Sequence, residues 1–167
     1  MARTPMIPVL LSVITGIAVL VFLLGDRLGG IPEGLRPGVV LPAARLKTVA
    51  GRAVDTLEWR GTPTLLVVFQ PSCAACNREI GKLAGLASDY PEVNMVLVSL
   101  ETPSPDYGVP FTVCTDPSGE FIYRIRKVMV PTLYGIDREG RIAFTRMGKR
   151  PAEEEKALLA ALAGKFR

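Results

Sequence analysis

The chain has 167 residues, enough for one compact domain and a short extra segment, and 20 Lys and Arg against 16 Asp and Glu give a net charge of +4. This mild positive excess does not predict nucleic-acid binding. The chain has three Cys and no His, which excludes His-assisted hydrolysis and C-x-x-C-H haem attachment, and disfavours zinc and copper sites. We therefore expect no metal and no other cofactor, and chemistry that depends on Cys or carboxylate side chains.

The N-terminal 25 residues predict a membrane anchor. Residues 4–25 contain no charged side chain, and a helix over the apolar residues 7–24 just reaches across the ~30 Å hydrocarbon layer. A cleaved secretory signal and a buried helix of the domain are the alternatives, but Gly25-Asp26-Arg27 follows the apolar run in place of an A-x-A-like cleavage site. A long following domain is translocated largely regardless of flanking charge. We therefore expect a single-pass anchor in a bacterial cytoplasmic membrane, with the catalytic domain on the periplasmic side.

The rest of the chain predicts a Gly- and Pro-rich linker over residues 26–38 and one α/β domain over residues 39–167. Apolar runs predict strands over residues 44–49, 64–69, 93–100, 111–115, 133–136 and 141–145, with a turn over 137–140 between the last two. Helical spacing predicts helices over 74–88, 118–126 and the final segment. There Pro151 suits the first helical position, and Glu153, Glu154 and Glu155 suit the positive end of the helix.

A C-x-x-C motif formed by Cys73 and Cys76 stands between a predicted buried strand and a predicted helix. Strand, C-x-x-C and helix in this order are typical of a redox site. Cys73 would lie at the N-terminus of the helix, where free backbone N–H groups and the helix dipole stabilise the thiolate that attacks disulfides. Cys76 would face the same side and close the disulfide. A static disulfide or two small buried residues are the alternatives, and the third thiol, Cys114, is interpreted as a small buried residue in a strand.

The layout from about residue 37 to the C-terminus resembles the membrane-anchored TlpA/ResA-type thiol-disulfide oxidoreductases, which have a thioredoxin-like fold. Beside the C-x-x-C, the matching segments are Leu-Glu-Trp-Arg-Gly at 57–61, Asp-Pro-Ser-Gly at 116–119, Val-Pro-Thr at 130–132 and Ile-Asp-Arg-Glu-Gly-Arg-Ile at 136–142. Two positions depart from the family pattern. Ser72 replaces the usual Trp before the first Cys, and Gly81 replaces a usual Pro. The segment Gln-Pro-Ser-Cys at 70–73 is more similar to the MauD branch.

The resemblance implies roles for three further residues. Pro131 would follow a cis peptide bond beside the C-x-x-C, and the backbone of Val130 would pair with an incoming substrate chain. Glu79, which helical spacing places between Leu83 and Leu86 at the border of the apolar face, would exchange a proton with Cys76. A Glu79 side chain that reaches solvent is the alternative.

We therefore expect a central mixed sheet flanked by helices, and a membrane-anchored enzyme in which Cys73 attacks and Cys76 resolves. The resemblance implies disulfide-bearing protein clients such as apocytochrome c, and a membrane thiol electron donor. A MauD-like thiol oxidant or assembly factor is the alternative within this class. A peroxiredoxin-like peroxidase is disfavoured because the P-x-x-x-[ST]-x-x-C pattern precedes neither Cys73 nor Cys76.

Overall fold

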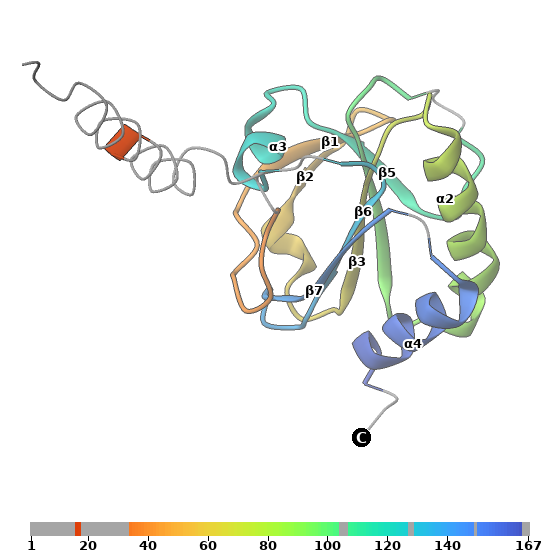
Figure 1. The fold of residues 1–167 in the computed structure, drawn as a ribbon. Helices are drawn as coiled ribbons and strands as arrows, with labels where there is room; N and C mark the ends of the chain where they lie inside the picture. The colour runs from red at the N-terminus through yellow and green to blue at the C-terminus, as the bar shows by residue number, and fades with distance from the viewer. Residues whose placement is uncertain (1–15, 18–33, 104–106, 127–128, 149, 165–167) are drawn as a thin grey trace, which may run out of the picture. The chain divides into compact units, whose positions relative to one another are not determined.

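The computed structural model describes residues 16–17, 34–103, 107–126, 129–148 and 150–164. Residues 33–167 form one compact unit (Figure 1). The predicted anchor lies outside the described residues except for Gly16 and Ile17. Within the described part of the chain, no helix has the length and apolar character needed to cross a membrane.

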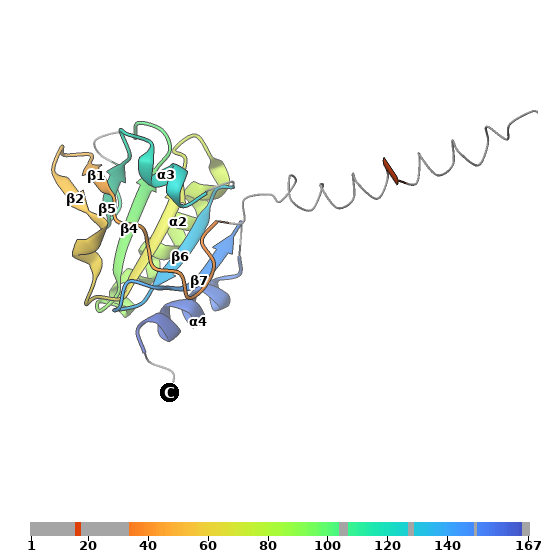
Figure 2. The ribbon, with the colours of Figure 1, turned by 90° about the vertical axis from the view of Figure 1, so that its left-hand side faces the viewer.

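The described residues of this unit form one mixed sheet with helices on both faces, as in a thioredoxin-like fold (Figure 2). The strands are β1 (Arg45–Thr48), β2 (Ala53–Asp55), β3 (Thr64–Phe69), β4 (Asn94–Ser99), β5 (Thr112–Thr115), β6 (Thr132–Ile136) and β7 (Ile142–Met147). The helices are the 3₁₀ turns η1 (Thr56–Trp59) and η2 (Ala87–Asp89) and the α-helices α2 (Ala74–Leu86), α3 (Glu120–Arg124) and α4 (Ala152–Leu162). The predicted strands and helices are confirmed, with ends that differ by a few residues, whereas β2 and η1 were not predicted.

The strand order is β2-β1-β5-β4-β3-β6-β7, in which β3, β4 and β5 run parallel and the other neighbours run antiparallel. All six residues of β3 are buried, because both faces of the central strands are covered. Leu66 and Val68 belong to one core, which also contains Trp59, Phe121 and Ile125 and which we call the α3-side core. The alternate β3 residues belong to a second core with Ile80 and Leu83, which we call the α2-side core.

Short polar side chains fix the turns around this sheet. Asp55 and Glu58 form a reciprocal capping box on η1. The Asp116 carboxylate accepts the Ile122 N–H at 2.9 Å near the start of α3. The Asp137 carboxylate accepts the Glu139 and Arg141 N–H groups in the predicted β6–β7 turn. Three of the segments that carry the family resemblance therefore have local structural roles.

Two details differ from the expectation at the ends of the domain. Leu35 and Gly38, expected in the linker, contact the fold: the Leu35 carbonyl accepts the Thr145 hydroxyl, and the Gly38 N–H donates to the Ile142 carbonyl at 2.8 Å. At the other end, α4 begins at Ala152, and Pro151 has an extended backbone and caps the helix instead of occupying its first turn. A proline ring fits both positions, so sequence alone does not separate them.

Candidate active site

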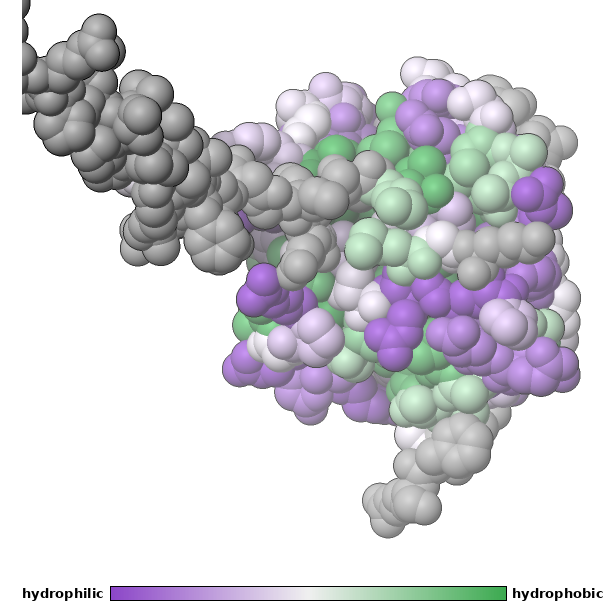
Figure 3. Space-filling model, in the orientation of Figure 1, coloured by the Kyte–Doolittle hydropathy of each residue, from purple (hydrophilic) through white to green (hydrophobic). Residues whose placement is uncertain are grey.

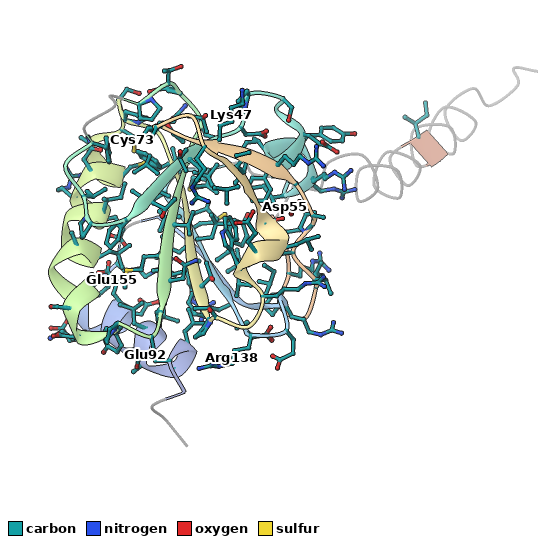
Figure 4. All side chains as sticks on the ribbon, turned by 180° about the vertical axis from the view of Figure 1, so that it is seen from behind. Lys47, Asp55, Cys73, Glu92, Arg138 and Glu155 are labelled. Carbon is teal, nitrogen blue, oxygen red and sulfur yellow. The ribbon has the colours of Figure 1, made fainter. Side chains whose placement is uncertain are left out.

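The two cysteines of the C-x-x-C lie where the sequence places them, between β3 and α2. Figure 4 labels Cys73 at one end of α2. Cys73 is the N-cap of this helix, and its Sγ accepts the backbone N–H of Cys76 at 3.2 Å. The Cys73 side chain is partly exposed, whereas Cys76 is 0% exposed. Both are free thiols.

The two thiols have opposite acidity. Partial burial works against ionisation of Cys73, but hydrogen bonds from the Cys76 thiol and from the Cys76 and Ala75 N–H groups, with the charge of Arg78, together lower its pKa. Burial, then the hydrogen bond to Cys73, raises the pKa of Cys76 to about 11. The site therefore holds one thiol that ionises readily and one that keeps its proton.

Ser72, which stands where the resembling family has Trp, is held by the carboxylate of Glu101, which follows β4. The Glu101 carboxylate accepts the Ser72 hydroxyl at 2.8 Å and the Ser72 N–H at 3.3 Å. Glu101 is itself fixed, because its carbonyl accepts the Ser99 hydroxyl at 2.6 Å. The β3–α2 turn is therefore anchored to the carboxyl end of β4.

On the other side of the motif, Asn77 and Tyr107 secure the first turn of α2. The Asn77 amide donates to the Pro71 carbonyl at 3.0 Å, and its oxygen accepts the Tyr107 hydroxyl at 2.5 Å. The Tyr107 ring packs on Phe69 with 5.1 Å between the ring centroids. Burial, together with the charges of the Cys76 and Cys73 thiols, raises the pKa of Tyr107. Sequence reasoning missed this residue because the chain reaches it only after β4.

The Val130–Pro131 peptide bond is cis, as predicted. It precedes β6, which pairs with β3, the strand that leads into the C-x-x-C. Val130 is partly buried and packs against both cores. The α2-side core contains Cys76, and Cys73 also packs against it. The structure thus brings Val130 and the cysteines to one region, and substrate pairing through the Val130 backbone stays a prediction.

Glu79 is buried, at 0% exposure, so the alternative in which it reaches solvent is wrong. Its Oε2 accepts Lys82 Nζ at 3.2 Å. Lys82 Nζ also lies 3.5 Å from Oε1 of Glu155, a residue that is 1% exposed. Lys82 was not predicted, and Glu155 was expected only to favour the start of α4. Proton exchange between Glu79 and Cys76 stays a prediction.

Cys114 is separate from this site. It lies on β5 at 0% exposure in the α3-side core, whereas Cys76 belongs to the α2-side core on the other face of the sheet. Burial raises the pKa of Cys114 to about 11. Its interpretation as a small buried residue is confirmed.

Comparison with known proteins places these features in a family. The AhpC/TSA family model matches residues 37–145, well over half of the chain. The chain belongs to the AhpC/TSA family. The matched segment of this AhpC/TSA member contains the C-x-x-C, the cis proline and most of the sheet.

The relatives agree with the predicted type of enzyme. The thiol-disulfide oxidoreductase ResA of Bacillus thuringiensis subsp. konkukian is 21% identical over 131 residues, which cover 73% of this chain and 76% of the relative. Among solved structures, a putative thiol:disulfide interchange protein DsbE from Chlorobium tepidum superposes with a TM-score of 0.69 at 24% identity, covering 78% of this chain and 99% of that one. StoA from Bacillus subtilis superposes with a TM-score of 0.59 at 22% identity, covering 71% of this chain and 97% of that one. These structures share the fold.

The family match, the ResA-like sequence and the two close thiols together support the prediction of a C-x-x-C thiol-disulfide oxidoreductase related to the TlpA/ResA group.

Proposed function

We propose that this AhpC/TSA family member is an extracytoplasmic, membrane-anchored thiol-disulfide oxidoreductase that reduces disulfide bonds in protein clients. The observation that carries the proposal is the inequality of the two thiols at the start of α2. Cys73 is partly exposed with a lowered pKa, and Cys76 is buried with a pKa raised to about 11. Because the thiolate is the attacking species, Cys73 engages the client and Cys76 acts second.

The reaction consists of two exchanges. The Cys73 thiolate attacks one sulfur of the client disulfide, the client S–S bond breaks, and the other client sulfur leaves as a thiolate that takes a proton from solvent. Cys76 then loses its proton and attacks the Cys73 sulfur, which forms the Cys73–Cys76 disulfide and releases the second client thiolate. Two electrons pass from the enzyme to the client, so a thiol donor must reduce the enzyme again.

The direction of transfer is proposed from the environment of the motif. The two residues between the cysteines, Ala74 and Ala75, add neither charge nor a His that would stabilise the thiolate strongly, as powerful thiol oxidants require. The thiol-disulfide activity named for the ResA and DsbE relatives supports thiol-disulfide exchange. The TlpA/ResA resemblance supports apocytochrome c as a client and a membrane protein as donor. The membrane anchor rests on the apolar residues 7–24.

Trapping of mixed disulfides tests the order of attack. Cys76→Ser should accumulate client proteins bound through Cys73, because nothing then releases them, whereas Cys73→Ser should trap none. Cys114→Ala is the matched control and should behave as the unmodified chain. Trapping through Cys76 or Cys114 would overturn the assignment.

The reduction potential tests the direction. A value near that of thioredoxin, about −270 mV, supports a reductant, whereas a value near about −120 mV supports the MauD-like oxidant. Peroxide consumption by the reduced enzyme, measured in parallel, would indicate a peroxidase.

A further inference from the structure

Behind the active site, α2 and α4 bring together three charged groups, of which the two carboxylates are buried. The Lys82 ammonium lies 3.2 Å from Glu79 Oε2 and 3.5 Å from Glu155 Oε1, and it donates to the Arg150 carbonyl at 2.6 Å. Both carboxylates are nearly inaccessible, whereas the Lys82 side chain is 32% exposed. Figure 4 labels Glu155 between α2 and α4, and Figure 3 shows hydrophilic residues over the region where these two helices meet.

The charges in this cluster do not balance. Two buried carboxylates face one ammonium, and among the described residues Glu79 Oε1 and both carboxylate oxygens of Glu155 accept no hydrogen bond. A buried carboxylate without enough partners strongly favours its protonated form.

The Arg side chains near the start of α4 contact Glu154 and not this cluster. The Arg150 guanidinium, from the segment before α4, contacts Glu154 at 3.4 Å and the Met147 carbonyl at 3.0 Å. Arg146 of β7 also contacts Glu154. Tyr90, which follows η2, is the titratable group that packs on α4 from this side, and its hydroxyl donates to the Lys156 carbonyl. Lys82 is therefore the cation that the two carboxylates share.

The pKa shifts of Glu155 and Lys82 agree with this geometry. Burial, then the proximity of Glu79, raises the pKa of Glu155 to about 7. The pKa of Lys82 is raised by Glu79 and Glu155 despite the opposing effect of burial, so the ammonium keeps its charge. Glu155 is therefore the carboxylate of this cluster that gains and loses a proton near neutral pH.

Glu79 lies one helical turn from Cys76 on α2, and both residues are 0% exposed. We propose that Glu155 is a positioning residue that, through the Lys82 ammonium it shares with Glu79, holds the Glu79 carboxylate in place and so lets the Glu79–Glu155 pair take up the proton that Cys76 loses during resolution. This inference rests on the proposed function. In the step concerned, the Cys76 S–H proton passes to Glu79, the Cys73–Cys76 bond forms, the bond from Cys73 to the client breaks, and the client sulfur leaves as a thiolate.

The sign of each substitution follows from the charges. Glu155, whose pKa is about 7, must be ionised before the pair accepts the Cys76 proton, so the resolution rate of the native chain should rise with pH through an inflection near 7. Glu155→Gln removes a like charge and should move the inflection to lower pH by about one unit. Lys82→Met removes the shared cation and should move it to higher pH by a similar amount. A residue with only a structural role would not shift the profile in opposite directions.

The measurement is the reaction of the reduced full chain with 5,5′-dithiobis(2-nitrobenzoate), followed by stopped flow from pH 5.5 to 9. Attack by Cys73 releases the first thionitrobenzoate, and attack by Cys76 on the mixed disulfide releases the second, whose rate reports resolution. Glu153→Gln removes an exposed charge from the same turn of α4 and is the matched control, with an unchanged profile expected. Circular dichroism checks that each variant is folded.

Two kinds of failure are distinguishable. If the native chain releases no second thionitrobenzoate, the proposed function fails. If it does but Glu155→Gln and Lys82→Met leave the inflection in place or move it in the same direction, the inference fails and the function stands. Infrared spectra of the native chain give a test that needs no variant, because the pair should show a protonated carboxyl band that fades as the pH rises through 7. Absence of that band at pH 6 would overturn the inference.

Discussion

At the scale of single residues, burial separates three chemically identical thiols. Cys73 ionises readily because hydrogen bonds at the N-terminus of α2 outweigh its partial burial. Cys76 and Cys114 are both 0% exposed, and both have a pKa raised to about 11. Sequence spacing distinguished the roles of Cys73 and Cys76, but only the two separate cores show that Cys114 is remote from them.

The raised pKa of Cys114 predicts a loss of stability at alkaline pH. Below about pH 9 this thiol is neutral in the folded and unfolded chain alike, so it adds no pH dependence. Between about pH 9 and 11 the unfolded chain loses the proton first, so the free energy of unfolding falls as the pH rises. A shift of about two units corresponds to about 3 kcal/mol.

Cys114→Ala should therefore reduce the alkaline loss of stability. We expect its unfolding free energy to fall less than that of the native reduced chain from pH 8 to 11, by up to about 3 kcal/mol. Urea unfolding at a series of pH values checks this, and any cavity effect of the substitution appears as a constant offset. Parallel curves for the two proteins would show that Cys114 ionises normally in the folded state.

The sequence predicted one buried carboxylate of the site, Glu79, but not its neighbours Glu155 and Lys82. Glu79 was singled out because it borders the apolar face of its helix, between Leu83 and Leu86, and because the family resemblance implies a functional Glu at this position. Glu155 carries the same signal, since it lies four residues before the buried Leu159 on α4, yet it was interpreted only as an N-terminal charge. Its pairing with Lys82 joins two helices far apart in the chain, and no local pattern shows such a contact.

At the scale of elements, long apolar runs were predictable and short edge elements were not. β3 matches its predicted range, Thr64–Phe69, because six consecutive apolar or β-branched residues suit a strand covered on both faces. β2 has three residues, Ala53–Asp55, and pairs only with β1 at the edge of the described sheet. A segment that short has too little alternation to indicate a strand, and its position depends on pairing with β1.

The packing of elements predicts opposite effects for two glycines. A Cβ on Gly135 of β6 would overlap the Phe144 ring from β7, whereas a Cβ on Gly81, on an exposed part of α2, would meet nothing within 4 Å. Gly135→Ala should lower the free energy of unfolding by about 1–3 kcal/mol because the strands must shift. Gly81→Ala should raise it by about 0.5–1 kcal/mol because alanine favours the helix.

Urea unfolding of both variants beside the native chain measures the two effects. Each substitution adds one methyl group, so each serves as the control for the other. A stable Gly135→Ala variant would mean that β6 and β7 are not packed as closely as the structure shows.

At the scale of the whole molecule, topology determines where the chemistry takes place. β3 and β4 are adjacent and parallel, so their carboxyl ends meet at one edge of the sheet. Cys73 follows the first strand and Glu101 follows the second, and Ser72 joins them there. Reactive groups in α/β proteins generally collect at this edge. The order of elements and the C-x-x-C were enough to predict the fold class, whereas the Ser72–Glu101 contact depends on two segments that meet only in the folded chain.

The last prediction concerns the division between the proposed anchor and the domain. The full chain should stay in the membrane fraction after alkaline washing, because residues 7–24 are apolar and just long enough to span. A chain that begins at residue 33 should be soluble and should still trap clients in the Cys76→Ser background, since residues 33–167 form one compact unit. A chain that begins at residue 41 should be less stable by about 2 kcal/mol, because it loses the backbone hydrogen bonds that join Gly38 and Val39 to Ile142. Fractionation, trapping and urea unfolding measure these three outcomes. A mature protein that starts just after Gly25 would show that the apolar segment is a cleaved signal, and release of the full chain by the alkaline wash would show that this segment is not an anchor.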